Sequence, residues 1–242
     1  MAENYFKHFP TIDFDLKNDG NLIEAKDIFR SIRISSAVED AISGYEYYYV
    51  GDQDRPDVTA TKLYGDATLY WLFWMVNDHL AVHNDWPKSQ RVLERFIKRK
   101  YSGKSLVAPF QSDIVSSSDS KFFQGEKVVG STSSAFGYVT KIDPTNNQLI
   151  LNDIEGSFQV GETVTGSNSS KSFIISSVRN FSDAPHHYED SEGNKTTISN
   201  GNTPVSNHDY EQTLNDSKRS IKYIKGEFVS QLLREFKSFI RS

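Results

Sequence analysis

The strongest hydrophobic pattern in the chain is the run Leu69–Val76, eight apolar residues that read LYWLFWMV. Asp66, just before it, is a residue type that caps helix N-termini, and Gly65 can end a short helix that precedes it. The pattern predicts a helix over about residues 67–77. Because a helix that is apolar on every side must be covered on every side, we expect this helix to anchor the protein, in its own core or against a partner.

Periodicities nearer the N-terminus and after the apolar run predict further elements. An extended arm or edge strand is expected at residues 3–16, a tyrosine-rich strand at Ser43–Val50, and helices at 57–64 and 87–101. The second helix carries four basic residues opposite its apolar face, Arg91, Arg95, Lys98 and Arg99. A basic stripe can bind phosphate groups, but a solvated helix face is the simpler interpretation.

The C-terminal part of the chain shows a second helical pattern. Apolar residues recur at three- and four-residue steps from Leu214 to Ile240, which predicts one long helix with a weak point at Gly226. This helix is a good candidate to cover the apolar helix at residues 67–77. The polar segment before it, residues 180–213, is expected to form loops or a loose hairpin.

The middle of the chain contains an internal repeat. Gly125–Ser134 (GEKVVGSTSS) matches Gly161–Ser170 (GETVTGSNSS) at an offset of 36 residues, 161 minus 125. Glycine turns alternate with short β-branched stretches, so we expect about six short strands in a small β-barrel or sandwich with two similar halves. The serine-rich residues 102–120 are interpreted as a linker to this module. Neither repeat has the lysine or the helix start of a phosphate-binding P-loop.

Composition narrows the class of protein. The 242 residues include no cysteine, which excludes disulfides, thiolate metal sites and a cysteine nucleophile and fits a reducing compartment. A net charge of −5 argues against binding driven by nucleic-acid phosphates. The first residues lack the pattern of a signal peptide, and an apolar run of eight is too short to span a bilayer. We therefore expect a soluble protein.

Candidate chemical sites are few. His79 and His83 lie one helical turn apart, but Leu80 stands where a zinc protease needs glutamate, so surface or capping histidines are the simpler interpretation. The pair His186–His187 has no accompanying ligand motif. No metal site and no cofactor is predicted.

Catalytic patterns are also weak. The chain has no Gly-x-Ser-x-Gly nucleophile elbow. Adjacent carboxylates at Glu39–Asp40 and Glu189–Asp190 could in principle serve glycoside hydrolysis, but neighbouring residues usually point apart and are solvated. The residues themselves therefore indicate a two-part protein without an enzyme signature.

Several short motifs follow one another in close spacing: Asp27-Ile-Phe-Arg30, Gly44-Tyr-Glu-Tyr-Tyr-Tyr-Val50, Arg55-Pro56, Leu63-Tyr64-Gly65, Leu69-Tyr70-Trp71, Asn77-Asp78 and Trp86. In this order they resemble the small baseplate wedge subunit of T-even-like contractile-tailed bacteriophages, in a cyanophage-like form with an inserted β module. The resemblance covers about residues 25–101 and 186–240.

This resemblance implies an α+β fold with a mainly helical wedge domain, built from N- and C-terminal segments, and an inserted small all-β module that contains the internal repeat. The expected domains are residues 1–104, the N-terminal wedge part with its arm; 105–180, the β module; and 181–242, the C-terminal wedge part. No catalytic residues are implied.

The resemblance also implies a function. The chain would be a structural subunit of the virion tail baseplate, assembled in the host cytoplasm, that joins neighbouring wedge proteins and helps wedges associate into the six-fold baseplate around the hub. Implied partners are other wedge proteins, including the lysozyme-like sheath-initiator subunit and the large wedge scaffold protein, with six or more copies per baseplate. Nucleic acid and membrane are not among them. A tail-associated cell-wall hydrolase and a carbohydrate-binding module remain alternatives.

The candidate interface or organising residues are Arg55, Tyr70, Trp71, Trp74 and Trp86. Tryptophan and arginine dominate the energetics of protein interfaces, which is why these positions are chosen. Trp71 and Trp74 also suit an internal core, the more economical interpretation for both.

Overall fold

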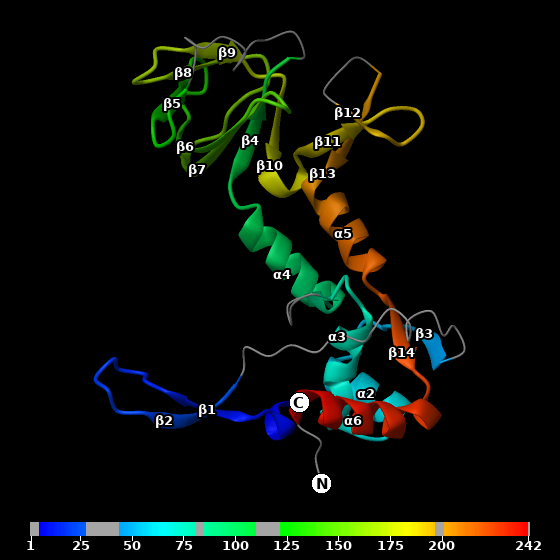
Figure 1. Ribbon diagram of the computed structural model, residues 1–242. Helices are drawn as coiled ribbons and strands as arrows, with labels where there is room; N and C mark the ends of the chain where they lie inside the picture. Colours follow the sequence, from blue (N-terminus) through cyan, green and yellow to red (C-terminus); the bar gives the residue numbers. More distant parts are fainter. Residues whose placement is uncertain (1–4, 28–43, 81–84, 110–121, 197–200, 242) are drawn as a thin grey trace. The chain divides into compact units, whose positions relative to one another are not determined.

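A computed structural model describes residues 5–27, 44–80, 85–109, 122–196 and 201–241 (Figure 1). The chain forms two compact units: Met1–Gln90 with Asn215–Ser242, and Arg91–Leu214. The first unit therefore combines the two ends of the sequence, and the second unit is continuous.

The first unit mixes short helices with two small antiparallel sheets, β1–β2 and β3–β14. Its elements are a 3₁₀ helix at Tyr5–His8, β1 (Thr11–Phe14), β2 (Ile23–Lys26), β3 (Tyr45–Tyr49), α2 (Pro56–Tyr64), a 3₁₀ helix at Ala67–Trp71, α3 (Leu72–Val76), β14 (Ser220–Ile224) and α6 (Gly226–Arg241).

The second unit is built on a curled sheet of seven strands in the order β10-β4-β7-β6-β5-β8-β9, with every pair antiparallel (Figure 1). A three-stranded sheet, β12-β11-β13, and two helices complete it. Its elements are α4 (Gln90–Lys100), β4 (Lys104–Val107), β5 (Lys127–Gly130), β6 (Phe136–Asp143), β7 (Gln148–Glu155), β8 (Thr163–Gly166), β9 (Ser172–Ile174), β10 (Ser177–Asn180), a 3₁₀ helix at Phe181–Asp183, β11 (Pro185–Glu189), β12 (Lys195–Thr196), β13 (Thr203–Ser206) and α5 (Asn207–Ser217).

The prediction of a mainly helical wedge domain is wrong. Across the described residues, strands occupy as much of the chain as helices do. The difference is largest near the C-terminus, where one long helix was expected and the structure has α5, β14 and α6. Ile221 and Ile224 have helical spacing, yet they lie in β14, which pairs with the tyrosine-rich β3. Two apolar residues three positions apart are compatible with a helix or with a short strand. Here pairing with the tyrosine-rich β3 makes the segment a strand.

The prediction of a linker before the β module is wrong where the structure describes it. Lys104–Val107 forms β4, which lies between β10 and β7 in the large sheet, and its Leu106 is fully buried. The short apolar stretch within the serine-rich residues is therefore an inner strand of the large sheet and not a linker. For residues 180–213 the expectation was loops or a loose hairpin. β11 does pair antiparallel with β12 and with β13, but the helix α5, which begins at Asn207, was not expected.

The apolar helix is confirmed, in two pieces. It begins as the 3₁₀ helix at Ala67–Trp71 and continues as α3. The Asp66 side chain accepts a hydrogen bond from the backbone N–H of Thr68 at 2.8 Å, as expected of an N-cap. Gly65 ends α2 with a left-handed backbone, φ 74°, which a glycine adopts without a steric penalty.

The sequence repeat is also a structural repeat. The backbone N–H of Gly125 donates to the Val139 carbonyl, and that of Gly161 donates to the Ile175 carbonyl, 36 residues on in each case. β5 of the first copy pairs with β8 of the second, and the register is symmetric. Val128 lies opposite Gly166, and the equivalent residues of the other copy, Val164 and Gly130, also lie opposite each other. The two copies are therefore related by an approximate two-fold axis between β5 and β8.

Candidate interaction surfaces

Trp71 joins the two ends of the sequence in the core of the first unit. Its ring lies 5.2 Å from that of Tyr5 and 4.8 Å from that of Phe236 on α6, and only 8% of the residue is exposed. Phe9, 2% exposed, belongs to the same cluster. This contact confirms that the C-terminal helix covers the apolar helix, and it makes Trp71 a core residue.

Trp74 and Trp86 form a second cluster with their rings stacked at 5.6 Å. Trp86 is buried, and its indole N–H donates a 2.8 Å hydrogen bond to the backbone carbonyl of Asp54. Trp74 is half-buried, and the Tyr70 ring meets it edge-on at 5.9 Å. Tyr70 itself is 40% exposed. The structure therefore brings three of the five candidate residues together at the margin of the core.

Arg55 directly follows Asp54, whose backbone carbonyl accepts the hydrogen bond from Trp86. It precedes α2, its side chain is 77% exposed, and it forms an ion pair with Asp57 at 3.2 Å. An ion pair this exposed contributes little to stability, about 0–1 kcal/mol. The roles of all five residues at an interface stay predictions.

Asp54 organises the turn before α2, a role that sequence patterns did not indicate. Its carboxylate accepts hydrogen bonds from the Tyr48 hydroxyl at 2.7 Å and from the backbone N–H of Gly51, and it pairs with Lys62. The hydrogen bond from Lys62 holds the pKa of Asp54 below its usual range. This network links β3, the turn before α2 and the last turn of α2.

Two tyrosines of β3 point outward. Tyr47 is 70% exposed and Tyr49 is 67% exposed, and alternation places both on one face of the strand. Tyr48 between them faces the core around Trp86. A tyrosine pair exposed to this extent is a candidate contact surface, because aromatic residues are enriched at protein interfaces.

Two buried glutamates hold the halves of the β repeat together. Glu162 accepts hydrogen bonds from the backbone N–H groups of Thr132 and Ser133 in the other copy, at 3.1 and 2.9 Å. Glu126 accepts the equivalent bonds from Asn168 and Ser169, at 3.2 and 3.0 Å. We call this reciprocal arrangement of Glu126 and Glu162 the glutamate clamp. In the sequence, the feature that indicates the clamp is the glutamate that follows the first glycine in both copies of the repeat.

The charge of the clamp is stabilised by backbone groups. Burial alone would raise the pKa of Glu162, but hydrogen bonds from the backbone N–H groups of Ser133 and Gln159 outweigh it and lower that pKa. Gly130 and Gly166 leave room for the carboxylates: a Cβ atom built on Gly130 would lie 2.7 Å from Glu162, and one on Gly166 would lie 2.6 Å from Glu126. The glycines and glutamates of the motif therefore act together.

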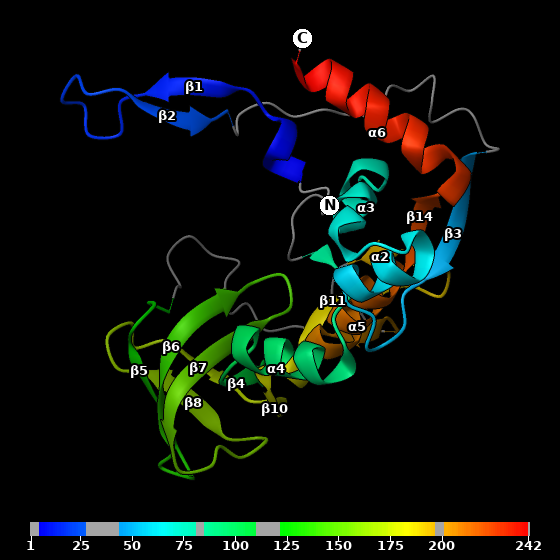
Figure 2. The ribbon, with the colours of Figure 1, turned by 90° about the horizontal axis from the view of Figure 1, so that it is seen from below.

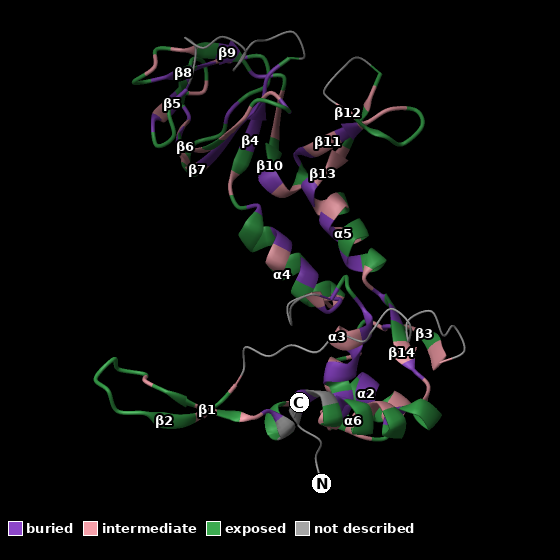
Figure 3. Ribbon diagram, in the orientation of Figure 1, coloured by how far each residue is buried: buried purple, intermediate pink, exposed green. Residues whose placement is uncertain are grey.

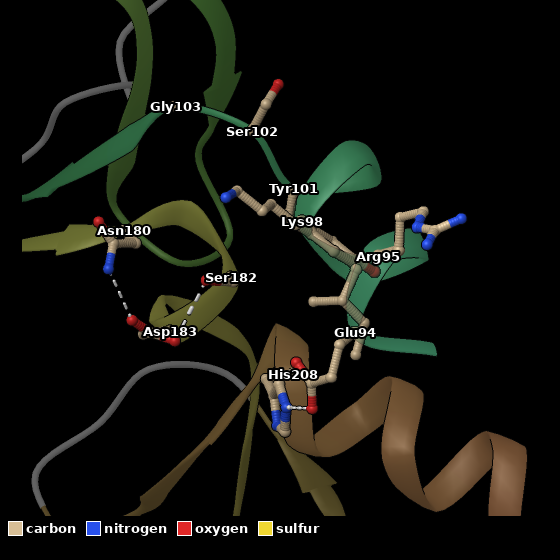
Figure 4. Close-up of a pocket in the computed structure, with 11 residues that line it drawn as sticks. Glu94, Arg95, Lys98, Tyr101, Ser102, Gly103, Asn180, Ser182, Asp183 and His208 are labelled. Atoms are coloured by element: carbon tan, nitrogen blue, oxygen red, sulfur yellow. Dashed lines mark hydrogen bonds and ion pairs between the residues drawn. The ribbon is translucent and has the colours of Figure 1, made fainter. Parts of the chain in front are cut away.

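Helices α4 and α5 border a groove of about 740 Å³ in the second unit (Figure 4). His208 on α5 contacts Glu94 on α4 at 3.0 Å, and this hydrogen bond raises the pKa of His208. Arg95, Lys98 and Asp183 also line the groove. Because both signs of charge are present, the lining does not select one class of charged ligand.

Behind the groove, Glu211 of α5 accepts hydrogen bonds from Lys100 at 2.6 Å and from the hydroxyl of Tyr101 at 2.8 Å. Burial, together with Glu211, raises the pKa of Tyr101 to about 12. This buried pairing fixes the end of α4 against α5.

The histidine candidates serve local contacts. His186 stacks on Tyr210 with ring centroids 3.7 Å apart, and its Nδ1 lies 2.9 Å from Nδ1 of His187. Both histidines are half-buried. His79 is exposed, whereas His83 and Glu39–Asp40 lie outside the described residues. Among the residues that are described, no group of three or more histidine, aspartate or glutamate side chains is arranged to hold a metal ion.

Comparison with known proteins finds similarity in the N-terminal half of the chain. A sequence model of the family described as base plate wedge protein 53 matches residues 5–114. The resemblance to phage baseplate wedge subunits is confirmed. The chain is also 30% identical over 101 residues to baseplate wedge protein gp53 of Enterobacteria phage T4, a match that covers 40% of this chain and 50% of that protein.

The chain thus spans about half the length of the curated relative it matches. The family match contains α2, the apolar helix, β3 and the five candidate residues. The expected resemblance of residues 186–240 lies beyond the matched range and stays a prediction. In the part of the chain that the structure describes, no helix is long and apolar enough to cross a bilayer.

Proposed function

We propose that this chain is a structural subunit of a phage tail baseplate wedge that joins neighbouring wedge proteins and helps wedges associate into the six-fold baseplate around the hub. The observation that carries the proposal is the position of exposed aromatic residues within the family match. Tyr47, Tyr49 and Tyr70 lie in that range and are 70%, 67% and 40% exposed. Exposed tyrosines above a rigid aromatic core suit lasting protein contacts.

The proposed partners are other wedge proteins, among them the lysozyme-like sheath-initiator subunit and the large wedge scaffold protein. Six or more copies would act per virion baseplate, assembled in the host cytoplasm without nucleic acid or membrane as a partner. A structural rather than enzymatic role is supported by the surroundings of the carboxylates Glu189 and Asp190. Glu189 lies beside His187, and Asp190 accepts hydrogen bonds from the turn at Glu192 and Asn194.

We propose that residues 105–180 are a module inserted between wedge parts 1–104 and 181–242. Support comes from how the module begins and ends: β4 and β10 pair antiparallel, with Lys104 opposite Asn180. The backbone N–H of Phe181 then donates to the Gly103 carbonyl at 3.0 Å. A segment that enters and leaves at one point can be added without separating the residues on either side.

Co-purification from infected cells tests the proposed function. A tagged chain should bring down other baseplate proteins in a stoichiometric complex. Tyr47→Ser with Tyr49→Ser should weaken that complex and leave the fold intact, because both side chains are outside the core. Thr165→Ala, at an exposed position on β8 of the β module, is the control.

A harsher variant, Trp74→Asp, should prevent association of wedges. Because Trp74 packs on Trp86, its result counts only if the circular dichroism spectrum of the variant is unchanged. Normal baseplate yield from a folded Trp74→Asp protein would contradict the proposal.

One observation favours carbohydrate binding by the β module as a second function. Phe136 and Tyr138 lie on the outer face of β6, and Tyr138 is 41% exposed beside Lys127 of β5. Phe136→Ala with Tyr138→Ala should then abolish binding to a host glycan array and leave baseplate assembly normal. Unchanged binding to the array would exclude this face.

A further inference from the structure

The N-terminal hairpin, β1–β2, exposes side chains that the rest of the first unit does not cover. β1 pairs with β2 from Thr11 opposite Lys26 to Phe14 opposite Ile23. The hairpin extends away from α3 and α6 in both views (Figures 1 and 2), and nearly all of it is exposed (Figure 3). A two-stranded hairpin by itself is marginally stable in water, so this one is suited to being covered.

The root of the hairpin is fixed even though its far end is exposed. Phe9 is buried among the aromatic rings of the first unit. The Lys26 ammonium group donates to the Phe9 carbonyl at 2.8 Å, and the backbone N–H of Asp27 donates to the Pro10 carbonyl. The arm is therefore held at its base while it presents two faces.

One face of the hairpin is apolar. Phe14 and Ile23 lie opposite each other and are 42% and 49% exposed, and Leu16 and Leu22 in the adjoining turn residues are 68% and 64% exposed. Four large apolar side chains exposed together mark an interaction site.

The opposite face carries an unfavourable pair of like charges. Asp13 lies directly across the hairpin from Glu24, and both are exposed. Two carboxylates at opposed positions destabilise a strand pair, and a cation from outside would relieve the repulsion. Residues 11–26 carry four acidic and two basic side chains, a net charge of −2. A surface that covers the hairpin must be apolar at its centre and cationic at its margin.

The exposed face of α4 has this composition. Val92 is 48% exposed, and Arg91, Arg95 and Arg99 surround it at helical spacing. Within the described parts of the chain, no acidic side chain forms an ion pair with Arg91, Arg95, Lys98 or Arg99. Arginine stems can cover apolar surface while their guanidinium groups reach carboxylates at the margin.

We propose that the hairpin of one copy of this chain docks on α4 of a second copy. This inference rests on the proposed function and names a contact between copies within it. Because the two surfaces differ, each copy has both a donor and an acceptor surface, and in the proposed contact they join head-to-tail from one copy to the next. Head-to-tail contacts generate rings when the rotation closes, which a six-fold baseplate provides. Val92 lies against Phe14 and Ile23 on the apolar face, and the long arginine side chains extend around the edge of the hairpin to Asp13 and Glu24 on the other face.

Sedimentation velocity on the purified full chain tests the proposal. At low salt the sedimentation coefficient should rise with protein concentration, and 1 M salt, where the screening length is about 3 Å, should weaken the association. Asp13→Lys with Glu24→Lys should weaken it about tenfold or more, and so should Arg95→Glu with Arg99→Glu. Lys222→Glu, an exposed charge reversal on β14, is the control and should leave association unchanged.

Mixing the two reversed variants is the decisive step. The reversed hairpin of one variant then meets the reversed helix of the other, so a mixed dimer should form although each variant alone is weakened. A wild-type chain that stays monomeric at low salt, or a mixture that stays monomeric, overturns the proposal.

The same variants separate this inference from the proposed function. If hairpin reversal stops baseplate assembly in infected cells and helix reversal does not, the hairpin binds a different baseplate protein. In that case the contact between copies is wrong, and the proposed wedge function stands.

Discussion

The first unit and the seven-stranded sheet of the second are held together by contacts of different range. In the first unit, Trp71 packs between Tyr5 and Phe236, so its core needs residues from both ends of the chain. In the sheet, β6 pairs with β7 across a short turn and β5 pairs with β6. Its core lies wholly within residues 106–178.

This difference predicts which changes should unfold each region. Loss of either terminus should unfold the first unit and leave the sheet folded. The sheet has its own core, and the glutamate clamp adds a polar contact between its two sequence-related halves. All three tryptophans lie in the first unit, so tryptophan fluorescence reports on it separately from the sheet.

The largest effect is expected from Trp71→Ala. The change leaves a cavity between the N-terminal residues and α6 and should lower the free energy of unfolding of the first unit by about 3–5 kcal/mol. Urea unfolding followed by tryptophan fluorescence measures it. Tyr70→Ala, a neighbouring and partly exposed ring, should cost much less. Equal losses for the two variants would contradict a core that depends on Trp71.

Gly166→Ala should break the sheet but not the first unit. The new Cβ would lie 2.6 Å from the Glu126 carboxylate, so the clamp must move, at a cost of about 1–3 kcal/mol. Faster hydrogen exchange in β5 and β8, with tryptophan fluorescence unchanged, is the expected result. The control is Gly226→Ala at the start of α6, where a Cβ meets open space. Unchanged exchange in Gly166→Ala would show that the clamp does not hold the halves.

Asn77→Ala tests a polar contact of the first unit. The Asn77 amide donates to the carbonyl of Lys222 at 2.9 Å and accepts from its backbone N–H at 2.8 Å. Removing it leaves buried groups unpaired and should cost about 1–2 kcal/mol in the same fluorescence assay. Asp78→Ala, next in sequence and exposed, should be neutral.

The smallest effect is expected from mild acid. Because the pKa of Glu162 is lowered on folding, its contribution to stability is fully present above the unfolded value of about 4.3 and is lost as pH falls below it. The sheet should therefore lose stability below about pH 4. Glu162→Gln should be less stable at neutral pH and should show a flatter pH dependence there. Parallel pH profiles for the two proteins would contradict this role.

Sequence patterns anticipated the elements whose signals are local. The cap at Asp66, the turn at Gly65, the strand around Tyr48 and the β repeat all follow from residues within a few positions of one another. The family resemblance came from the same region, and the matched residues confirm it.

Elements that depend on distant partners were not predictable in this way. β14 became a strand because β3 pairs with it, although about 170 residues separate them in sequence. β4 was mistaken for a linker because its neighbours in the sheet, β7 and β10, come much later in the chain. Among the candidate residues, the burial of Trp71 followed from its apolar context. The exposed ion pair of Arg55 follows a turn that Asp54 organises, and no local pattern reveals that turn.

The hydrogen bonds between Asn77 and β14 affect how readily this strand could pair with another copy of the chain. The amide of Asn77 occupies the N–H and C=O of Lys222 much as another strand would. An uncovered strand edge is a template on which identical chains can add to one another and aggregate. Any chain that is crowded by its own copies is exposed to this risk. A single side chain that imitates a peptide group keeps this edge from recruiting them out of register.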